Sequence, residues 1–175
     1  MNVEIFNHLT FAWIGIAILA FPFLLKVTAP YGRHTTNSWG PMLSNTLGWI
    51  LQEAPSLIFF SVFFLSGTLP KSNASYFFWC LWAAHYINRS FIFPFRTKTA
   101  GKKIPLLIVC SAIFFNFCNG FFNGYYLGNI GGNFSNDYFA SAQFIIGFLI
   151  FIIGVIVNHQ SDNILLASRS ISFCT

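Results

Sequence analysis

Glu53 is the residue with the most unusual chemical setting in this sequence. It is one of only four acidic residues, and it lies in an apolar stretch, residues 44–65, that is long enough to cross a bilayer core of about 30 Å. A carboxyl group at that depth costs roughly 2.5 kcal/mol or more unless it faces a protein interior, a cavity or a partner. Pro55 removes a backbone donor and tends to kink the helix beside the acid. We interpret Glu53 as functional, the alternative being an interhelical hydrogen bond that only holds a bundle together.

Tyr86, in the apolar stretch 76–95, is the predicted partner of Glu53. Two antiparallel neighbouring helices would place the phenol and the carboxyl group at about the same depth. Burial favours the protonated acid, and an acid and a phenol that meet at one point can stabilise an oxyanion, as in carbonyl or enone chemistry. His85 and Arg89 project from the same helix face as Tyr86, although Arg89 is also placed to extend towards the cytosolic surface.

Two further polar groups are candidate ligand contacts. One face of the fourth apolar stretch carries three asparagines, Asn116, Asn119 and Asn123. Interhelical hydrogen bonding and ligand contact explain them equally well. Just beyond the fifth stretch, Asn158, Ser161 and Asp162 share a helix face. This face is either a solvated helix end or a binding surface for a cofactor that enters from the cytosol.

The composition indicates an integral membrane protein. Hydrophobic residues make up 55% of the 175 positions and charged residues only 7%, against about 25% in soluble domains. The net charge of +5 is spread over short connections between apolar runs, so it predicts topology and lipid contact and not a nucleic-acid surface. The four cysteines lack metal-ligand spacing, and we expect no metal site.

Five apolar stretches predict a single all-α domain, a polytopic membrane helical bundle. The predicted spans are residues 9–25, 44–65, 76–95, 104–127 and 139–157. Basic residues concentrate in the first and third connections, which places those connections and the C-terminus in the cytosol and the N-terminus on the lumenal side. Glycosylation sequons at Asn73 and Asn133 fall in the two outer connections and are weak signals.

Several segments together resemble the steroid 5α-reductase family. They occur in the family's order, and they are residues 29–34 (APYGRH), 51–56 (LQEAPS), 85–89 (HYINR), 118–120 (CNG) and 158–165 (NHQSDNIL). The resemblance covers roughly residues 29–169, and the second and last segments are specific in combination.

The resemblance implies a seven-helix membrane enzyme, in the endoplasmic reticulum if the source is eukaryotic, that uses NADPH to reduce the Δ4 bond of a 3-oxo-steroid. Glu53 and Tyr86 would hold the 3-keto oxygen, with Gln52 at the junction of steroid and nicotinamide and Asn119 as a further substrate contact. The implied cofactor-binding residues are Gln52, Arg89, Asn158, Asp162 and Arg169.

The sequence departs from the family after residue 166, where the pattern implies a basic segment, a glycine-rich region and two more helices. We therefore expect a C-terminally truncated member with five of the seven helices, little activity by itself, and pairing with a full-length paralogue as one route to function. Two alternatives stay open: a reductase of enoyl-CoA or polyprenal lipids, and a non-catalytic membrane protein that binds sterol or a partner.

Overall fold

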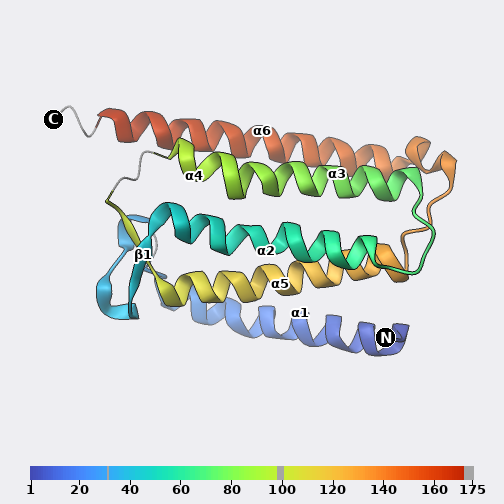
Figure 1. Ribbon diagram of the computed structural model, residues 1–175, viewed down its shortest axis with the longest axis horizontal. Helices are drawn as coiled ribbons and strands as arrows, with labels where there is room; N and C mark the ends of the chain where they lie inside the picture. The colour runs from blue at the N-terminus through green and yellow to red at the C-terminus, as the bar shows by residue number, and fades with distance from the viewer. Residues whose placement is uncertain (31, 98–100, 172–175) are drawn as a thin grey trace.

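The computed structural model describes residues 1–30, 32–97 and 101–171, and it is a bundle of long helices (Figure 1). The long helices are α1 (Val3–Lys26), α2 (Asn45–Leu65), α3 (Asn73–Ile87), α5 (Leu106–Asn129) and α6 (Ala142–Ile171). Short elements complete the described chain: the 3-10 helices η1 (Gly32–His34), η2 (Asn37–Trp39) and η4 (Asn136–Ala140), the π-helix η3 (Asn88–Ile92), helix α4 (Phe93–Arg96), and strands β1 (Met42–Ser44) and β2 (Lys103–Pro105). The start of α1 and the end of α6 lie at opposite ends of the bundle. The predicted class, an all-α membrane bundle, is confirmed.

Four helices in the described residues are long and apolar enough to cross a membrane, namely α1, α2, α5 and α6. The third predicted span is helical from residue 73 to residue 96 but is divided by η3. Pro94 lies in the first turn of α4 and cannot donate a backbone hydrogen bond, and the Phe93 N–H bonds to the Asn88 carbonyl five residues back. The π-turn therefore accommodates Pro94 without breaking the helix, and α3, η3 and α4 form one continuous rod.

Strands β1 and β2 form a small antiparallel ladder that the sequence did not predict. Leu43 pairs with Ile104, and the ladder joins the start of α2 to the start of α5 at one end of the bundle. Ile104 is almost fully buried, and its side chain lies against Gly48 of α2. Three-residue strands are too short for alternating hydrophobicity to be visible in a sequence.

Helices α2 and α5 form the tightest pair in the bundle. Gly120, Gly124 and Gly128 lie on the α5 face that meets α2, and a Cβ added at Gly124 would lie 2.6 Å from the carbonyl oxygen of Phe60. Small residues at such spacing allow two helix backbones to approach closely, which is the usual basis of helix association in lipid. The other long helices pack around this closely packed pair.

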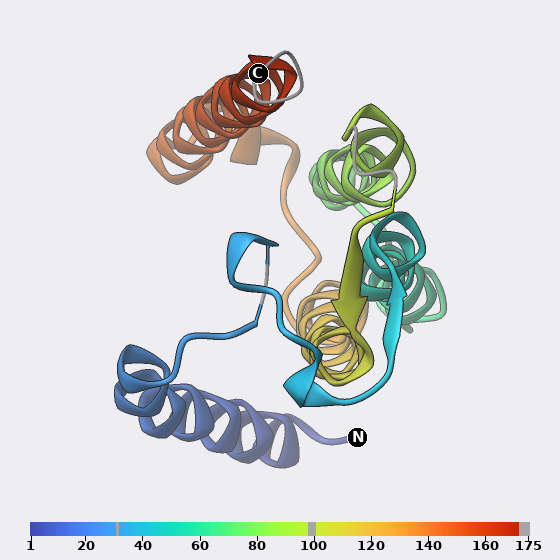
Figure 2. The same ribbon diagram turned by 90° about the vertical axis from the view of Figure 1, so that its left-hand side faces the viewer.

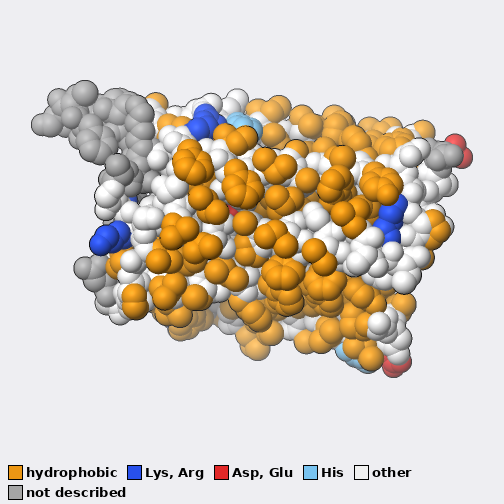
Figure 3. Space-filling view, in the orientation of Figure 1, with side chains coloured by type: hydrophobic (Ala, Val, Ile, Leu, Met, Phe, Trp, Pro, Cys, Tyr) orange, Lys and Arg blue, Asp and Glu red, His pale blue; other side chains and the backbone are white. Residues whose placement is uncertain are grey.

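The outermost helices pack more loosely. Figure 2 shows α1 and α6 at the two ends of an open arc in which α5, α2 and α3 lie between them. Phe6 is the buried residue of α1, and Asp162 is the one buried residue of α6 among its described side chains. The broad face in Figure 3 is covered by hydrophobic side chains, with charged groups towards the two ends, as expected for a surface in contact with lipid.

Candidate functional site

One face of α2 is turned towards α3 and carries the predicted acid. Its residues recur at one-turn and two-turn spacing, as a single helix face requires: Trp49, Glu53, Ser56 and Phe60. Helix α3 runs antiparallel to α2, so its chain order is reversed along this face. Arg89 lies over the ring of Trp49, and Trp82 donates to the Ser56 carbonyl at 3.2 Å. Glu53 therefore lies between the levels of Arg89 and Trp82, which is the level of Tyr86.

The Tyr86 hydroxyl is held in place by α5. It accepts a hydrogen bond from the side-chain amide of Asn119 at 3.2 Å, and the Asn119 side-chain oxygen accepts one from Asn123 at 3.0 Å. The Tyr86 ring packs against Trp82 with 5.1 Å between ring centroids. Glu53 is close enough to act electrostatically on the phenol. The acid and the phenol are thus on the same side of the bundle.

Ser56 completes the wall behind Tyr86. It is fully buried, and it lies within interaction range of the phenol without a hydrogen bond of regular geometry in the described structure. Phe60 lies one turn further along α2 and stacks on Trp82 with ring centroids 4.4 Å apart. The ring of Tyr86 consequently has little freedom to turn away from its position.

The largest of the cavities that the described residues line opens in front of Tyr86 and has a volume of about 610 Å³. We call it the main cavity. Its wall combines Phe60 of α2, residues of α3 between Phe78 and Tyr86, residues of α5 between Asn119 and Leu127, and Phe151 of α6. Cavities of a few hundred cubic ångströms with apolar walls and a few polar groups are typical of small-molecule sites. Here the polar groups gather at one side, around Tyr86 and Asn119.

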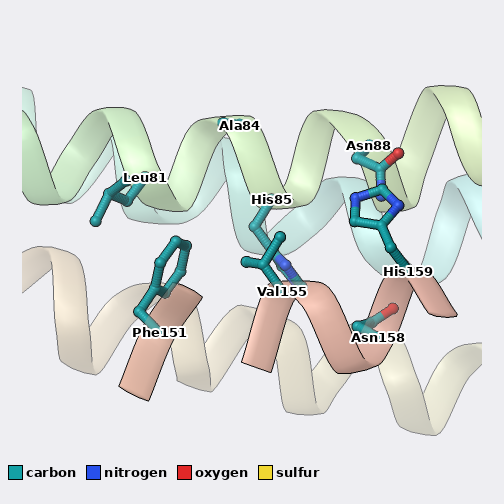
Figure 4. Close-up of a pocket in the computed structure, with 8 residues that line it drawn as sticks. All are labelled: Leu81, Ala84, His85, Asn88, Phe151, Val155, Asn158 and His159. Atoms are coloured by element: carbon teal, nitrogen blue, oxygen red, sulfur yellow. The ribbon is translucent and has the colours of Figure 1, made fainter. Parts of the chain in front are cut away.

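A smaller cavity of about 190 Å³ continues from the main cavity along the seam between α3 and α6 (Figure 4). The two share Leu81, His85 and Phe151. The smaller cavity also contains polar side chains from both helices: Asn88, Asn158 and His159. In Figure 4 the His159 side chain extends from α6 towards Asn88, the first residue of η3. Amide and imidazole groups therefore line this end of the seam.

Arg89 of η3 pairs with Asp162 of α6 just beyond this cavity. The guanidinium and the carboxylate are 3.5 Å apart, and the two side chains are 16% and 10% exposed. The guanidinium also lies over two aromatic rings, 4.7 Å from the centroid of Trp49 and 4.4 Å from that of Phe93. Such contacts stabilise a cation by about 0.5–2 kcal/mol each, depending on desolvation. We call the two rings the aromatic clamp.

The structure brings some of the predicted site residues together and separates others. Tyr86 and Asn119 line the main cavity, and Asn158 lines the smaller one. Arg89 and Asp162 bind each other beside a third cavity of about 220 Å³.

Gln52 does not face the described cavities. It is buried against α5, and its backbone carbonyl accepts a hydrogen bond from Asn116 at 2.6 Å. Asn116 therefore supports the α2–α5 contact, which is one of the two roles predicted for the asparagine row. The side chain of Arg169 lies outside the described residues.

The aromatic clamp and the buried Ser56 hydroxyl were not predicted from the sequence as parts of the site. Their signal was the spacing from Glu53, because Trp49 lies four residues before it and Ser56 three residues after it. Phe93 had no such signal, since its place beside Arg89 depends on the π-turn.

Comparisons with known proteins show what the chain is similar to. The 3-oxo-5-alpha-steroid 4-dehydrogenase family profile matches residues 102–172. The chain is 29% identical over 168 residues to the steroid 5-alpha-reductase DET2 of Gossypium hirsutum, an alignment that covers 94% of this chain and 65% of that protein. It is 31% identical over 142 residues to the human 3-oxo-5-alpha-steroid 4-dehydrogenase 1, covering 80% of this chain and 54% of the relative. The chain thus spans between about half and two thirds of the length of these relatives.

Proposed function

Because the chain is homologous to the 3-oxo-5-alpha-steroid 4-dehydrogenases, we propose that it binds a 3-oxo-Δ4-steroid in the main cavity and serves reduction of the Δ4 bond. The observation that carries this proposal is the placement of Tyr86. Asn119 donates a hydrogen bond to the Tyr86 hydroxyl, and Glu53 lies within electrostatic range of it. Tyr86 also lines the apolar main cavity of about 610 Å³. A ligand with one ketone on a rigid hydrocarbon body matches a site that is polar at one side only.

In this proposal Tyr86 and Glu53 polarise the enone. The Asn119 amide already donates to the phenol oxygen, which leaves the phenolic O–H as the group that donates to a ligand. Glu53 lies within electrostatic range of Tyr86 but does not line the described cavities, and in this proposal its protonated side chain reaches the ketone as a second donor. As negative charge develops on the 3-keto oxygen, both donors stabilise it, and the β-carbon becomes able to accept a hydride. One fixed donor of this kind contributes about 100- to 1,000-fold to the rate in known oxyanion sites.

Bound NADPH would supply the hydride in this scheme, and uptake of a proton from water at the α-carbon would complete the reduction. The smaller cavity fits the nicotinamide end of such a cofactor, because Asn88 and Asn158 offer amide groups that complement a carboxamide. Arg96 lies further out, donates to Asn163 at 2.8 Å, and is exposed to anionic groups at the bundle end. Arg89 and Asp162 would border the cofactor from their paired position, and we propose Arg169 as a phosphate contact.

We also propose that the end of the bundle that holds β1 and β2 faces the cytosol, and that the membrane is that of the endoplasmic reticulum. The described basic residues support this orientation. Lys26, Arg96, Lys102 and Lys103 lie at that end, whereas Lys71 lies at the opposite one.

A binding and turnover experiment tests the proposal. Membranes that contain the chain are incubated with a labelled 3-oxo-Δ4-steroid, with and without NADPH, and bound steroid and 5α-reduced product are measured. We expect saturable binding that Tyr86→Phe weakens about three- to tenfold, and any reduction to fall by about 100-fold or more in that variant. The matched control is Tyr76→Phe, an exposed tyrosine on the same helix, which should change neither quantity.

The outcomes separate the competing functions. Equal binding by the wild type and Tyr86→Phe contradicts the proposed site. Binding without reduction supports a steroid-binding role that needs a partner, and copurification with a longer paralogue would identify that partner. Preference for an enoyl-CoA or a polyprenal in the same assay assigns a different lipid class.

A further inference from the structure

Ser56 carries a buried hydroxyl that the proposed reduction does not use. The residue lies in the middle of α2 and is fully buried, and its Oγ has no hydrogen-bond partner of regular geometry among the described residues. Its backbone carbonyl, by contrast, accepts a hydrogen bond from Trp82 at 3.2 Å. A buried hydroxyl without a partner costs free energy, so a serine at such a position needs an explanation.

The usual acceptor for the hydroxyl of a helical serine is already occupied at this position. Such a hydroxyl donates to the carbonyl four residues earlier, as Ser66 does to Val62. For Ser56 that carbonyl belongs to Gln52, and the side-chain amide of Asn116 on α5 donates to it at 2.6 Å. The backbone N–H of Ser56 takes the other lone pair in a regular α-helix. The Ser56 hydroxyl therefore lacks the acceptor that its own helix would offer.

Within the described structure, the phenol oxygen of Tyr86 is the acceptor that lies within interaction range of Ser56. Asn119 of α5 donates to the same oxygen at 3.2 Å. If the phenol instead donated its proton to Ser56, the serine proton would have no acceptor in a buried wall. Donation from Ser56 to Tyr86 satisfies the serine, and it leaves the phenolic O–H for the main cavity, which Tyr86 lines.

We propose that Ser56 is a positioning residue for Tyr86: its hydroxyl donates to the phenol oxygen and, together with Asn119, directs the phenolic proton at the ketone of the ligand. The inference rests on the proposed function, because it takes the position of the ketone from there. Hydrogen bonds in a chain polarise one another, so two donors to the phenol oxygen make its own proton a stronger donor. Ser56 lines none of the described cavities and therefore acts on the ligand only through Tyr86.

Ser56→Ala is the variant that tests the inference, because it removes the hydroxyl and keeps the side chain small. Ser90→Ala is the matched control. Ser90 lies in η3, is equally buried, and also has an Oγ without a partner in the part of the chain that the structure describes. It lines none of the described cavities. Loss of a buried hydroxyl is therefore common to both variants, and only the contact with Tyr86 distinguishes them.

The first measurement is made without a ligand. The chain is prepared in membranes with ¹³C at Cζ of its tyrosines, and the Tyr86 resonance is assigned by its absence from Tyr86→Phe. We expect Ser56→Ala to shift this resonance by more than its linewidth, because the phenol oxygen loses a donor. Ser90→Ala should leave the resonance where it is.

The second measurement is a double-mutant cycle on the binding of androst-4-ene-3,17-dione to the same membranes. Ser56→Ala should weaken binding about two- to fivefold when Tyr86 is present, which is the size of one modest hydrogen-bond effect. In the Tyr86→Phe background the same change should have an effect of less than about 1.5-fold, because no phenol oxygen is left to accept. Ser90→Ala should change binding in neither background.

The two measurements separate this inference from the proposed function. An unshifted Tyr86 resonance in Ser56→Ala, or equal weakening of binding in both backgrounds, would overturn the inference and leave the proposed function standing. A shifted resonance in a chain that binds no steroid would support the hydrogen bond from Ser56 to Tyr86 and overturn the proposed function.

Discussion

The Arg89–Asp162 pair should hold α6 against the rest of the bundle, and this can be tested by a double-mutant cycle. Asp162 is the buried residue of α6 within its described side chains, and Arg89 is its ion-pair partner at 3.5 Å. The variants are Arg89→Met, which keeps an apolar side chain against the aromatic clamp, and Asp162→Asn, which keeps the size of the side chain. The double variant removes both charges.

The structure sets different magnitudes for the two single changes. Loss of one partner from a buried ion pair costs about 3–5 kcal/mol, while exposed pairs contribute about 0–1 kcal/mol. At 16% and 10% exposure the pair lies between these limits and nearer the buried one. We therefore expect Arg89→Met, which leaves the carboxylate unpaired, to lower the free energy of unfolding by about 2–3 kcal/mol.

Asp162→Asn should cost less, about 1 kcal/mol, because the guanidinium keeps both rings of the aromatic clamp. The double variant has no unpaired carboxylate and should cost less than Arg89→Met alone, about 1–2 kcal/mol, which gives a coupling energy of about 2 kcal/mol.

The assay is reversible unfolding in bicelles, followed by the separation of labels on α3 and α6. Arg96→Met is the control, because its hydrogen bond to Asn163 is exposed and its loss should cost less than about 0.5 kcal/mol. Additivity of the two single changes within about 0.3 kcal/mol would refute the coupling. A larger cost for Asp162→Asn than for Arg89→Met would refute the role of the aromatic clamp.

Three further predictions follow from other contacts. Gly124→Leu should lower the free energy of unfolding by about 1–3 kcal/mol, because a Cβ at this position would collide with the Phe60 backbone. Thermal melting measures the effect against Gly154→Leu, a position where a Cβ has no atom within 4 Å. Equal melting temperatures for the two variants would contradict the close α2–α5 contact. Asn119→Leu should leave the protein folded but lower the rate of any steroid reduction about tenfold or more, because the Tyr86 hydroxyl loses its hydrogen bond from Asn119. An unchanged rate would mean that the phenol needs no hydrogen bond from α5. Trp79→Phe should cost about 1 kcal/mol in the same melting assay through loss of the 3.0 Å hydrogen bond to Ser61, and no cost would show that lipid or water replaces that bond.

Composition and residue spacing were sufficient to predict the bundle, because an apolar run of twenty residues in a bilayer has to form a helix or part of a closed barrel. Antiparallel order of neighbouring spans aligns residues by depth, and Glu53 lies within electrostatic range of Tyr86. That these two side chains act together on a ketone stays a prediction.

The contacts that the sequence did not reveal join segments far apart in the chain. Asp162 lies 73 residues from Arg89, and its pairing depends on how α6 docks along α3. The π-turn before Pro94 shifts Phe93 onto Arg89, which a regular helix would not predict. The glycine face of α5 could be seen as a pattern, but its partner on α2 could not.

The most direct test of the account is the carbonyl stretching frequency of a bound 3-oxo-Δ4-steroid that carries ¹³C at C3, measured by isotope-edited infrared spectroscopy in membranes. Donation from Tyr86 predicts a lower frequency for the bound steroid than for the same steroid in lipid, reversed in part by Tyr86→Phe and unchanged by Tyr76→Phe. A frequency that is the same in the wild type and in Tyr86→Phe would contradict the central claim that the Tyr86 hydroxyl donates a hydrogen bond to the ketone.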